Sequence, residues 1–384
     1  MLHSPQRNGF RQQLLGWFAE FQRDLPWRRT KDPYRIWLSE IMLQQTRVAA
    51  VIPYYERFLE RFPTMQALAE APEEEVLRHW AGLGYYSRAR NLQKAARQIV
   101  ALYGSVFPDT LKETLALSGI GTYTAAAILS IAYDKKFAVL DGNVARVLAR
   151  IGAIRGDLRT SSRWQQLQKA ADELLAPETP GNWNQAMMEL GATVCTPRSP
   201  QCLLCPVGDF CRTKKLGLSD VIPETRKKRA AVEITLAALV IVDKAELTLL
   251  FAPPTKGSRT ATAHDVAALL SRMWHFPTLQ VGRNALRELR EFAENCGLVD
   301  GKLGSRFIPL VRVRHTVTYR QITVLPFRLN VRKLPHVPQA KSFPLEDLSA
   351  VPVSNLTRKV ARAALMEPLP KAGKTNSRTL RLHR

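Results

Sequence analysis

The sequence predicts a mainly α-helical N-terminal part followed by a smaller α+β domain. Three observations support this fold class. Apolar residues recur at helical spacing, interrupted by prolines, as far as residue 216. Runs with the length and composition of strands begin at residue 232. Four of the five cysteines lie within residues 195–211, where the helical pattern ends.

Residues 8–216 are expected to be almost entirely helical. Ile36, Leu38, Ile41 and Met42 have the spacing of a helix with one apolar face. Residues 86–103 predict a basic amphipathic helix, most of whose charges are expected to face solvent. Residues 162–176 and 182–194 are also expected to be helical. The prolines that precede or open candidate helices are Pro26, Pro33, Pro63, Pro72 and Pro108.

The composition changes after residue 216. Residues 217–231 contain a basic run at 226–229 and few apolar residues, which is typical of an interdomain linker. Strands are expected at 232–242, 247–251, 311–317 and 321–329, with one helix near 283–296. The tail at 363–384 is polar and basic, and we expect it to be disordered.

The net charge indicates the class of partner. The 384 residues carry a formal charge of +23, and 46% of them are hydrophobic, enough for two or three packed domains. A polyanion such as nucleic acid explains this excess, although scattered surface lysines are the plainer alternative. No apolar run approaches the roughly 18 residues of a membrane span, so no membrane partner is expected. The N-terminus lacks a secretory signal pattern, which predicts a cytoplasmic, nucleoid-associated protein.

The cysteine run has the spacing C-x6-C-x2-C-x5-C, formed by Cys195, Cys202, Cys205 and Cys211. Four thiolates this close together predict a metal centre, because disulfides are rare in a reducing compartment. A structural zinc site remains an alternative. The single C-x2-C pair and the uneven loops favour an iron–sulfur cluster wrapped by one segment.

Gly119 and Gly121 flank one apolar residue between two helical stretches. Glycines permit positive φ and close approach of the backbone, and the free amides at the start of the following helix can bind phosphate. A tight turn between packed helices is the alternative. In so basic a chain, the pattern favours a hairpin that grips a DNA backbone.

Two carboxylates are candidates for acid–base chemistry. Glu40 lies in an otherwise apolar helix, on one face with Trp37 and Gln44. Burial there would raise its pKa and keep it protonated, whereas an exposed glutamate on an amphipathic helix is the alternative. Asp141 directly precedes a helix. Its alternative role is a helix N-cap, and both roles are compatible.

Together these motifs resemble the helix–hairpin–helix DNA glycosylases of the endonuclease III superfamily, and within it the MutY family of adenine DNA glycosylases. The resemblance rests on the glycine hairpin, on Asp141 eighteen residues beyond Tyr123, and on the cysteine spacing. Supporting stretches lie at 27–29, 32–46, 82–90, 140–144 and 182–186. It covers residues 8–216 strongly and the rest weakly.

The resemblance implies a domain organisation and a cofactor. Residues 1–26 and 136–216 would form a cluster domain that holds one [4Fe–4S] cluster on the four cysteines. Residues 27–135 would form a six-helix domain containing the hairpin, with the active site in the cleft between the two. Residues 232–362 would form a Nudix-like domain that recognises 8-oxoguanine on the opposite strand.

The resemblance also implies the reaction. Glu40 would protonate N7 of a flipped adenine, Asp141 would face C1′ of the deoxyribose, and Asn143 and Tyr123 would position these carboxylates. Endonuclease III carries a lysine at the position of Tyr123, which makes an imine with the sugar; a phenol cannot. We therefore expect a monofunctional enzyme that leaves an abasic site in DNA containing 8-oxoguanine·adenine or guanine·adenine mispairs. The protein is expected to be a monomer.

Further residues match positions that contact DNA in the family. Gln45 and Tyr85 would fill the base stack around the mispaired purine; a helix-surface amide and a core tyrosine are the alternatives. Thr318 and Tyr319 stand where many relatives carry Phe-Ser-His for the damaged base, and they would take over those contacts. The residues expected to line the adenine pocket are Arg28, Leu43, Gln44 and Gln185.

Overall fold

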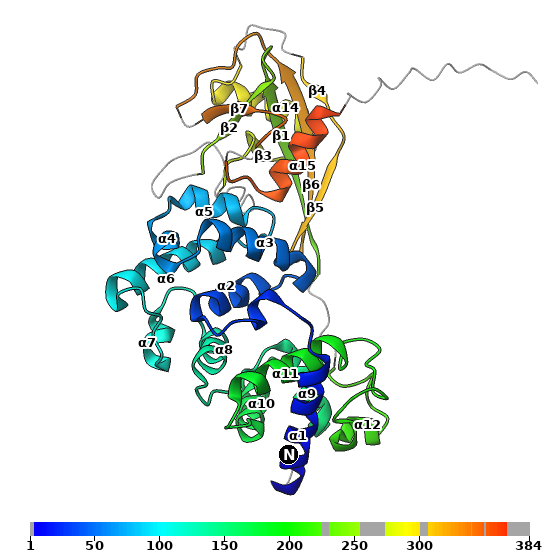
Figure 1. Cartoon of the computed structure of the whole chain (residues 1–384). Coiled ribbons are helices and arrows are strands. Elements are labelled where there is room, and N and C mark those ends of the chain that lie inside the picture. The colour runs from blue at the N-terminus through cyan, green and yellow to red at the C-terminus, as the bar shows by residue number, and fades with distance from the viewer. Residues whose placement is uncertain are drawn as a thin grey trace, which may run out of the picture. The chain divides into compact units, whose positions relative to one another are not determined.

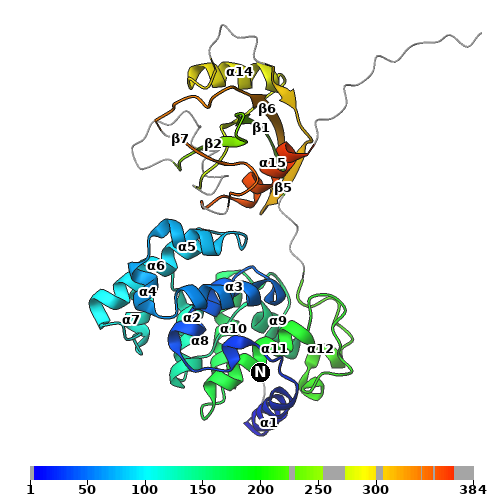
Figure 2. The ribbon, with the colours of Figure 1, turned by 45° about the horizontal axis from the view of Figure 1, so that its top comes forward.

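The computed structural model describes residues 4–224, 230–253, 273–299, 306–338, 340–348 and 351–366. The chain forms two compact units, Met1–Lys228 and Arg229–Arg384 (Figures 1 and 2). The basic run at 226–229 and the tail from residue 367 lie outside the described residues. The finer division of the first unit into a six-helix domain and a cluster domain stays a prediction.

The first unit is helical, as its apolar periodicity predicts. Its first elements are α1 (Ser4–Phe21), the 3-10 turn η1 (Pro26–Arg28), α2 (Pro33–Leu43), α3 (Val48–Arg61), α4 (Met65–Glu70), α5 (Glu73–Trp80) and α6 (Ser87–Tyr103). They are followed by α7 (Leu111–Ala116), α8 (Thr122–Tyr133), α9 (Gly142–Gly152), α10 (Ser161–Leu174), α11 (Pro180–Thr193), the 3-10 turn η2 (Gly208–Phe210) and α12 (Arg212–Lys215). In the described part of the chain, no helix has both the length and the apolarity needed to cross a membrane.

Local signals fix where α2 begins. Asp32 is its N-cap, and the carboxylate accepts a 2.8 Å hydrogen bond from the Tyr34 backbone N–H. Pro33 opens the first turn, where its missing N–H costs nothing. Trp37 on the same helix is fully buried. The rings of Tyr34 and Phe107 pack on it edge-on, so this face of α2 is anchored in the core.

Three close helix contacts hold the frame of the site. Helix α2 packs on α8, and α11 packs on both α8 and α9. At Gly181 a Cβ atom would lie 2.7 Å from the Ser130 carbonyl oxygen, and at Gly191 it would lie 2.7 Å from the Asn143 Cβ. Glycine therefore lets α11 approach α8 and α9 more closely than any side chain would permit.

The second unit contains a seven-stranded sheet of β1 (Val232–Val242), β2 (Leu247–Phe251), β3 (Thr278–Gln280), β4 (Ile308–Pro309), β5 (Val313–Val317), β6 (Arg320–Asn330) and β7 (Ala340–Pro344). The main strand order is β4-β6-β1-β2-β7, with β3 on β1 and β5 on β6. The long strands β1 and β6 run parallel, from Val232 opposite Arg320 to Val242 opposite Asn330. The other pairings between the strands named above are antiparallel.

Helices cover both faces of this sheet. Leu236, Ala238 and Val240 of β1 pack in the core that includes α15 (Asn355–Leu365). The intervening Ala237 and Leu239 pack in the core that includes α14 (Ala285–Asn295). Figure 2 shows α14 and α15 on either side of the sheet. Because side chains alternate between the two covered faces, β1 is apolar and buried from Leu236 to Val242.

The predicted α+β character of the C-terminal third is confirmed. β1 and β2 have the expected bounds, while the bounds of β5, β6 and α14 differ from the expected ones by at most two residues. Two expectations were incomplete. The short strands β3, β4 and β7 were not predicted, and residues 363–365 belong to α15 rather than to the expected tail.

Candidate active site

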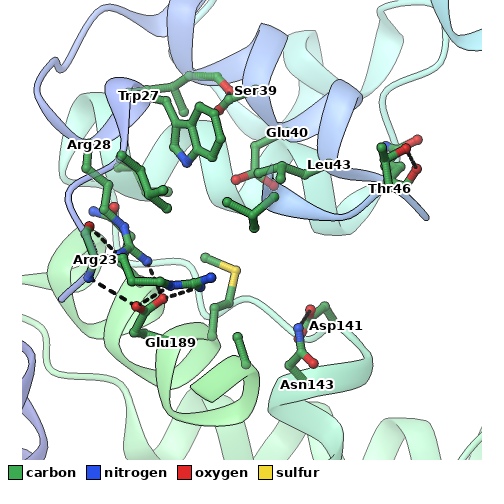
Figure 3. Close-up of a pocket in the computed structure, with 18 of the residues that line it drawn as sticks. Arg23, Trp27, Arg28, Ser39, Glu40, Leu43, Thr46, Asp141, Asn143 and Glu189 are labelled. Atoms are coloured by element: carbon green, nitrogen blue, oxygen red, sulfur yellow. Dashed lines mark hydrogen bonds and ion pairs between the residues drawn. The ribbon is translucent and has the colours of Figure 1, made fainter. Parts of the chain in front are cut away.

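One cavity of about 520 Å³ lies in the first unit and gathers residues from η1, α2, α8, α9 and α11 (Figure 3). It brings together most of the side chains expected to take part in chemistry or base binding. Those that line it are Arg28, Glu40, Leu43, Gln44, Gln45, Tyr123, Asp141, Asn143 and Gln185.

Glu40 lies in the wall of this cavity and is only 7% exposed. The exposed alternative is therefore wrong. Burial raises the pKa of Glu40 to about 7, and the negative charge of Asp141 acts in the same direction. A hydrogen bond from Tyr123 and the positive charge of Arg28 oppose the rise. Near neutral pH this carboxyl group is therefore partly protonated and can donate a proton.

Asp141 is the N-cap of α9, so the capping role is confirmed and coexists with a place in the cavity wall. Its carboxylate accepts a 2.7 Å hydrogen bond from the Val144 backbone N–H and a 3.0 Å bond from Asn143 Nδ2. Burial raises the pKa of Asp141, while these donors lower it. Bonds of this kind stabilise the anion, as does the N-terminus of a helix.

Tyr123, on α8, is bonded directly to Glu40. Its hydroxyl donates a 2.7 Å hydrogen bond to Glu40 Oε2 and also approaches Met188 Sδ at 3.4 Å. Burial, and then the charges of Glu40 and Asp141, raise the pKa of Tyr123 well above its ordinary value. The phenol therefore stays neutral and serves as a donor.

An ion-pair cluster on the cavity wall was not predicted. Glu189 on α11 is 1% exposed and accepts bonds of 2.7 and 2.6 Å from Arg23 and 2.8 Å from Arg28 (Figure 3). These two arginines hold the pKa of Glu189 down at about 2, despite its burial. Arg28 was expected in the pocket; its anchor on Glu189, more than 160 residues away, depends on tertiary structure that no local pattern reveals.

Gln45 and Tyr85 are the tips of two turns. Both have positive φ, 58° and 49°, which is uncommon for residues other than glycine. Gln45 is exposed and lines the rim of the cavity. Tyr85 is 42% exposed, so the core-tyrosine alternative is wrong, and it is not among the residues that line this cavity.

The glycine hairpin connects α7 to α8. Gly119 has a φ of 78°, and a Cβ atom there would lie 2.6 Å from Asn91 Cβ, so both conformation and space require glycine. Gly121 is the N-cap of α8, is exposed, and offers no side-chain cap to the first-turn amides. Neither glycine lines the cavity. The hairpin is therefore a separate surface, with the free amides that an anion site needs.

The four cysteines of the 195–211 segment line one small cavity together with Arg150 and Lys214. All four are free thiols, and Arg150 Nη1 approaches Cys195 Sγ at 3.3 Å. Burial raises the pKa of Cys205 to about 11, so four thiolates require compensating positive charge. Across the described residues, no three His, Cys, Asp or Glu side chains lie close enough to hold a single metal ion. Four thiol groups around one small cavity are the ligand set of an iron–sulfur cluster.

Thr318 and Tyr319 lie in the second unit. They form the two-residue turn between β5 and β6, with Thr318 at a φ of 54°. The Arg320 guanidinium stacks 4.9 Å from the centroid of the Tyr319 ring. The sequence therefore places these two residues at the tip of a hairpin.

Comparisons with known proteins agree with this arrangement. Residues 38–177 match the HhH-GPD superfamily of base excision DNA repair proteins, and residues 195–211 match the iron–sulfur binding domain of endonuclease III. The chain thus carries the binding segment for one [4Fe–4S] cluster. The solved structure of a thermostable thymine-DNA glycosylase superposes with a TM-score of 0.51 at 29% identity, covering 55% of this chain and 98% of that one.

Curated relatives identify the family more closely. The human adenine DNA glycosylase is 50% identical over 216 residues, which cover 54% of this chain and 39% of the human protein. The chain thus spans about two fifths of the length of the human and rat relatives. The Schizosaccharomyces pombe adenine DNA glycosylase is 33% identical over 324 residues, which cover 72% of this chain and 70% of that protein. The chain belongs to the adenine DNA glycosylase family.

Proposed function

We propose that this protein removes adenine from mispaired DNA by hydrolysing the N-glycosidic bond of a flipped nucleotide, as part of base excision repair. The observation that carries the proposal is the pair of buried carboxyl groups in one cavity. Glu40 has a raised pKa and one phenol donor, whereas Asp141 accepts bonds from a backbone amide and a side-chain amide. This is the acid and anion pair that glycosidic bond cleavage requires.

The proposed reaction assigns a role to each of these groups. Protonated Glu40 donates its proton to N7 of adenine, and the electrons of the C1′–N9 bond move onto the base. The Asp141 carboxylate stabilises the cationic sugar. Water then adds to C1′ and passes its proton to the Glu40 carboxylate, which restores the acid. Asn143 orients Asp141, and the neutral Tyr123 orients Glu40. The products are free adenine and an abasic site.

Tyr123 supports a monofunctional enzyme. Strand cleavage by a glycosylase of this superfamily requires an amine that forms an imine with the sugar, and a phenol has none to offer. Its hydroxyl is also committed to Glu40 and Met188. We therefore propose that the backbone stays intact after the base leaves.

The chain also carries features suited to extruding a base from a duplex. A base in a duplex must be flipped out before the glycosidic bond is accessible, and the gap in the stack must be filled. Gln45 and Tyr85 are exposed at turn tips and are the candidates to fill it. The net charge of +23 supplies attraction to phosphate, and the uncapped start of α8 at Gly121 offers amides for it.

For the second unit we propose recognition of the base opposite the adenine, which would be 8-oxoguanine or guanine. The Thr318–Tyr319 turn presents a hydroxyl and an aromatic ring at the end of a hairpin. The double substitution Thr318→Ala and Tyr319→Leu should lower the preference for 8-oxoguanine over guanine. Excision of adenine opposite guanine should change little.

The test is a single-turnover assay on duplexes that place adenine opposite 8-oxoguanine, guanine or thymine, and on one with an oxidised pyrimidine. We expect release of adenine opposite 8-oxoguanine and guanine, with nicking only after alkali. Release of the oxidised pyrimidine while adenine stays would contradict the proposal. Nicking without alkali would favour a bifunctional enzyme. Salt-sensitive binding without any base release would indicate a non-catalytic iron–sulfur DNA-binding protein.

A further inference from the structure

Arg88, in the first turn of α6, joins the two turns that end in Gln45 and Tyr85. We propose that Arg88 is a positioning residue that holds these two tips as one rigid element and sets their position relative to Glu40. This inference rests on the proposed function, because the tips matter only if a base is extruded from DNA.

The first set of contacts is to the end of α2. Arg88 Nη1 donates to the carbonyl oxygens of Ile41 at 2.7 Å, Met42 at 3.1 Å and Gln44 at 2.7 Å. These belong to the last turn of α2 and to its C-cap, where carbonyls lack partners within the helix. One cation therefore caps α2 at its partially negative end, directly beside the turn that carries Gln45.

The second set is to the turn that carries Tyr85. Arg88 Nη2 donates to the carbonyl oxygens of Leu83 at 3.4 Å and Gly84 at 3.2 Å. The guanidinium also lies 5.4 Å from the centroid of the Tyr85 ring and 5.5 Å from that of the buried Trp80. The guanidinium of Arg88, which caps α2, therefore also packs against the ring of the exposed Tyr85.

Both tips need external support. Gln45 and Tyr85 adopt left-handed backbone conformations that side chains disfavour, and such residues persist only where their surroundings fix them. Gly82 and Gly84 in the second turn also have positive φ, at 117° and 73°. Thr46 Oγ1 also donates to the Gln44 carbonyl and Trp80 Nε1 to the Gly84 carbonyl, while Arg88 bonds to both and so joins the two tips.

The contacts of Arg88 to α2 also lie next to Glu40, the proposed acid. Ile41 and Met42 follow Glu40 directly, so their carbonyl contacts to Arg88 fix the helical turn that carries the proposed proton donor. Insertion of the tips into a duplex would therefore be coupled to the placement of Glu40. Burial lowers the pKa of Arg88 to about 10, so the guanidinium stays charged at neutral pH.

The chain offers a matched control on the same helix. Arg97 also donates from its guanidinium to two backbone carbonyls, at 2.9 Å to Ala69 and 3.3 Å to Ala71. It supports the connection between α4 and α5, which carries neither tip. Arg88→Met and Arg97→Met therefore remove the same kind of structural contact, and only the first removes contacts to the tips.

The experiment is a double-mutant cycle on adenine release under single turnover, with 2-aminopurine beside the target adenine as a reporter of extrusion. In the parent chain we expect Gln45→Ala and Tyr85→Ala each to slow release about tenfold, which corresponds to about 1.4 kcal/mol. When Gln45→Ala or Tyr85→Ala is added to Arg88→Met, release should be less than about twofold slower than in Arg88→Met alone, because the tips are already displaced. The fluorescence rise should be lost in Arg88→Met and kept in Arg97→Met.

Arg88→Lys keeps the charge but not the planar fork, so it should restore stability more than it restores extrusion. Full tenfold effects of the tip variants in Arg88→Met, or equal loss of extrusion in Arg97→Met, would overturn the inference. Should Arg88→Met fail to fold, the same cycle is measured in Arg88→Lys. Reduced effects of the tip substitutions there support the inference, and full tenfold effects overturn it. If the parent chain itself releases no adenine from any duplex, the proposed function fails instead, and the two failures are thereby distinguished.

Discussion

The Tyr123 hydroxyl donates a 2.7 Å hydrogen bond to Glu40 Oε2, joining α8 to α2 inside the cavity. The phenol favours the ionised glutamate, whereas burial of the carboxyl group favours the protonated one. Burial is the larger effect, so the pKa of Glu40 rises to about 7. The hydrogen bond from Tyr123 keeps it from rising further. A general acid works best when its pKa lies near the working pH, and this bond helps to set that value.

Replacement of the proposed acid should abolish excision without loss of the fold. Glu40→Gln keeps the shape of the side chain but has no acidic proton, so adenine release should fall by about 10²- to 10⁴-fold. Binding to a mispaired duplex should persist in a gel-shift or anisotropy assay. Glu60→Gln, an exposed glutamate on α3, is the control and should release adenine at the parent rate. Normal release by Glu40→Gln would remove Glu40 from its assigned role.

The same variant should be more stable than the parent at alkaline pH. The folded-state pKa of Glu40 is about 7 against an ordinary value of 4.5, so its contribution to stability is complete below 4.5 and is lost as the pH rises through 7. At pH 8 a neutral glutamine should therefore raise the free energy of unfolding by on the order of 3 kcal/mol. Denaturant unfolding at pH 4.5 and pH 8 measures the difference, and an equal gain at both would contradict it.

Asp141→Asn separates the chemical role of Asp141 from its structural one. Asparagine caps helices about as well as aspartate, so the bond to the Val144 N–H should survive and α9 should remain intact. The sugar cation would lose its negative partner, so DNA binding should persist while adenine release collapses. Asp141→Ala should in addition cost about 1 kcal/mol of stability through loss of the cap. An active Asp141→Asn variant would show that the carboxylate charge is unnecessary.

Glu189→Gln should destabilise the fold. It leaves Arg28 and Arg23, which are 10% and 39% exposed, without the carboxylate they share. Loss of one partner from a buried ion cluster costs about 3 kcal/mol or more. Glu189 has a pKa of about 2, so its contribution is present above 4.5 and is lost as the pH falls through 2. Asp24→Asn, which removes an exposed partner of Arg29, is the control and should leave the denaturation midpoint in place.

The cysteine segment should hold iron. Purified under anaerobic conditions, the protein should show an absorbance band near roughly 400 nm and bind about four iron atoms per chain. Cys205→Ser should lose both, whereas Cys296→Ser should keep them, because Cys296 lies at the end of α14 in the second unit. A stoichiometric content of zinc without the band would overturn the cluster assignment.

The first unit was predictable because its information is local. Proline positions, apolar spacing and the motif at 195–211 each act within a few residues, and the corresponding helices appear where expected. In the second unit β1 was predicted with its bounds, but its parallel pairing with β6 joins positions 88 residues apart, as for Val232 and Arg320. The strands β3 and β4 are three and two residues long, too short for alternation to be recognised. Strand β7 is as long as β2, but its sequence Ala-Lys-Ser-Phe-Pro has no β-branched residue and ends in proline, so it lacks the composition of a strand.

The site divides in the same way. Local patterns predicted that Asp141 caps a helix, and for Glu40 they left an exposed surface glutamate as an alternative. The resemblance to the endonuclease III superfamily pointed to both residues, and the structure places them in one cavity. Glu189 was missed because its place in the cavity wall depends on bonds to Arg23 and Arg28, which lie 166 and 161 residues away in the sequence. Arg88 was predicted to share a mostly solvated helix face, yet its guanidinium is bound to carbonyls of two turns. Helix α15 did have a signal, the Ser354 cap before Leu356 and Val360, that sequence reasoning overlooked.

The pH dependence of adenine release under single turnover, on a duplex with adenine opposite 8-oxoguanine, tests the pairing of a protonated Glu40 with an ionised Asp141 most directly. Burial raises the pKa of Asp141 above its ordinary 3.8, so release should fall in acid as that carboxylate is neutralised. Release should also fall about tenfold per pH unit above a pH near 7, as Glu40 loses its proton. A bell-shaped profile with these two limbs is the predicted result. A rate that stays flat or rises from pH 7 to pH 9 would contradict the account.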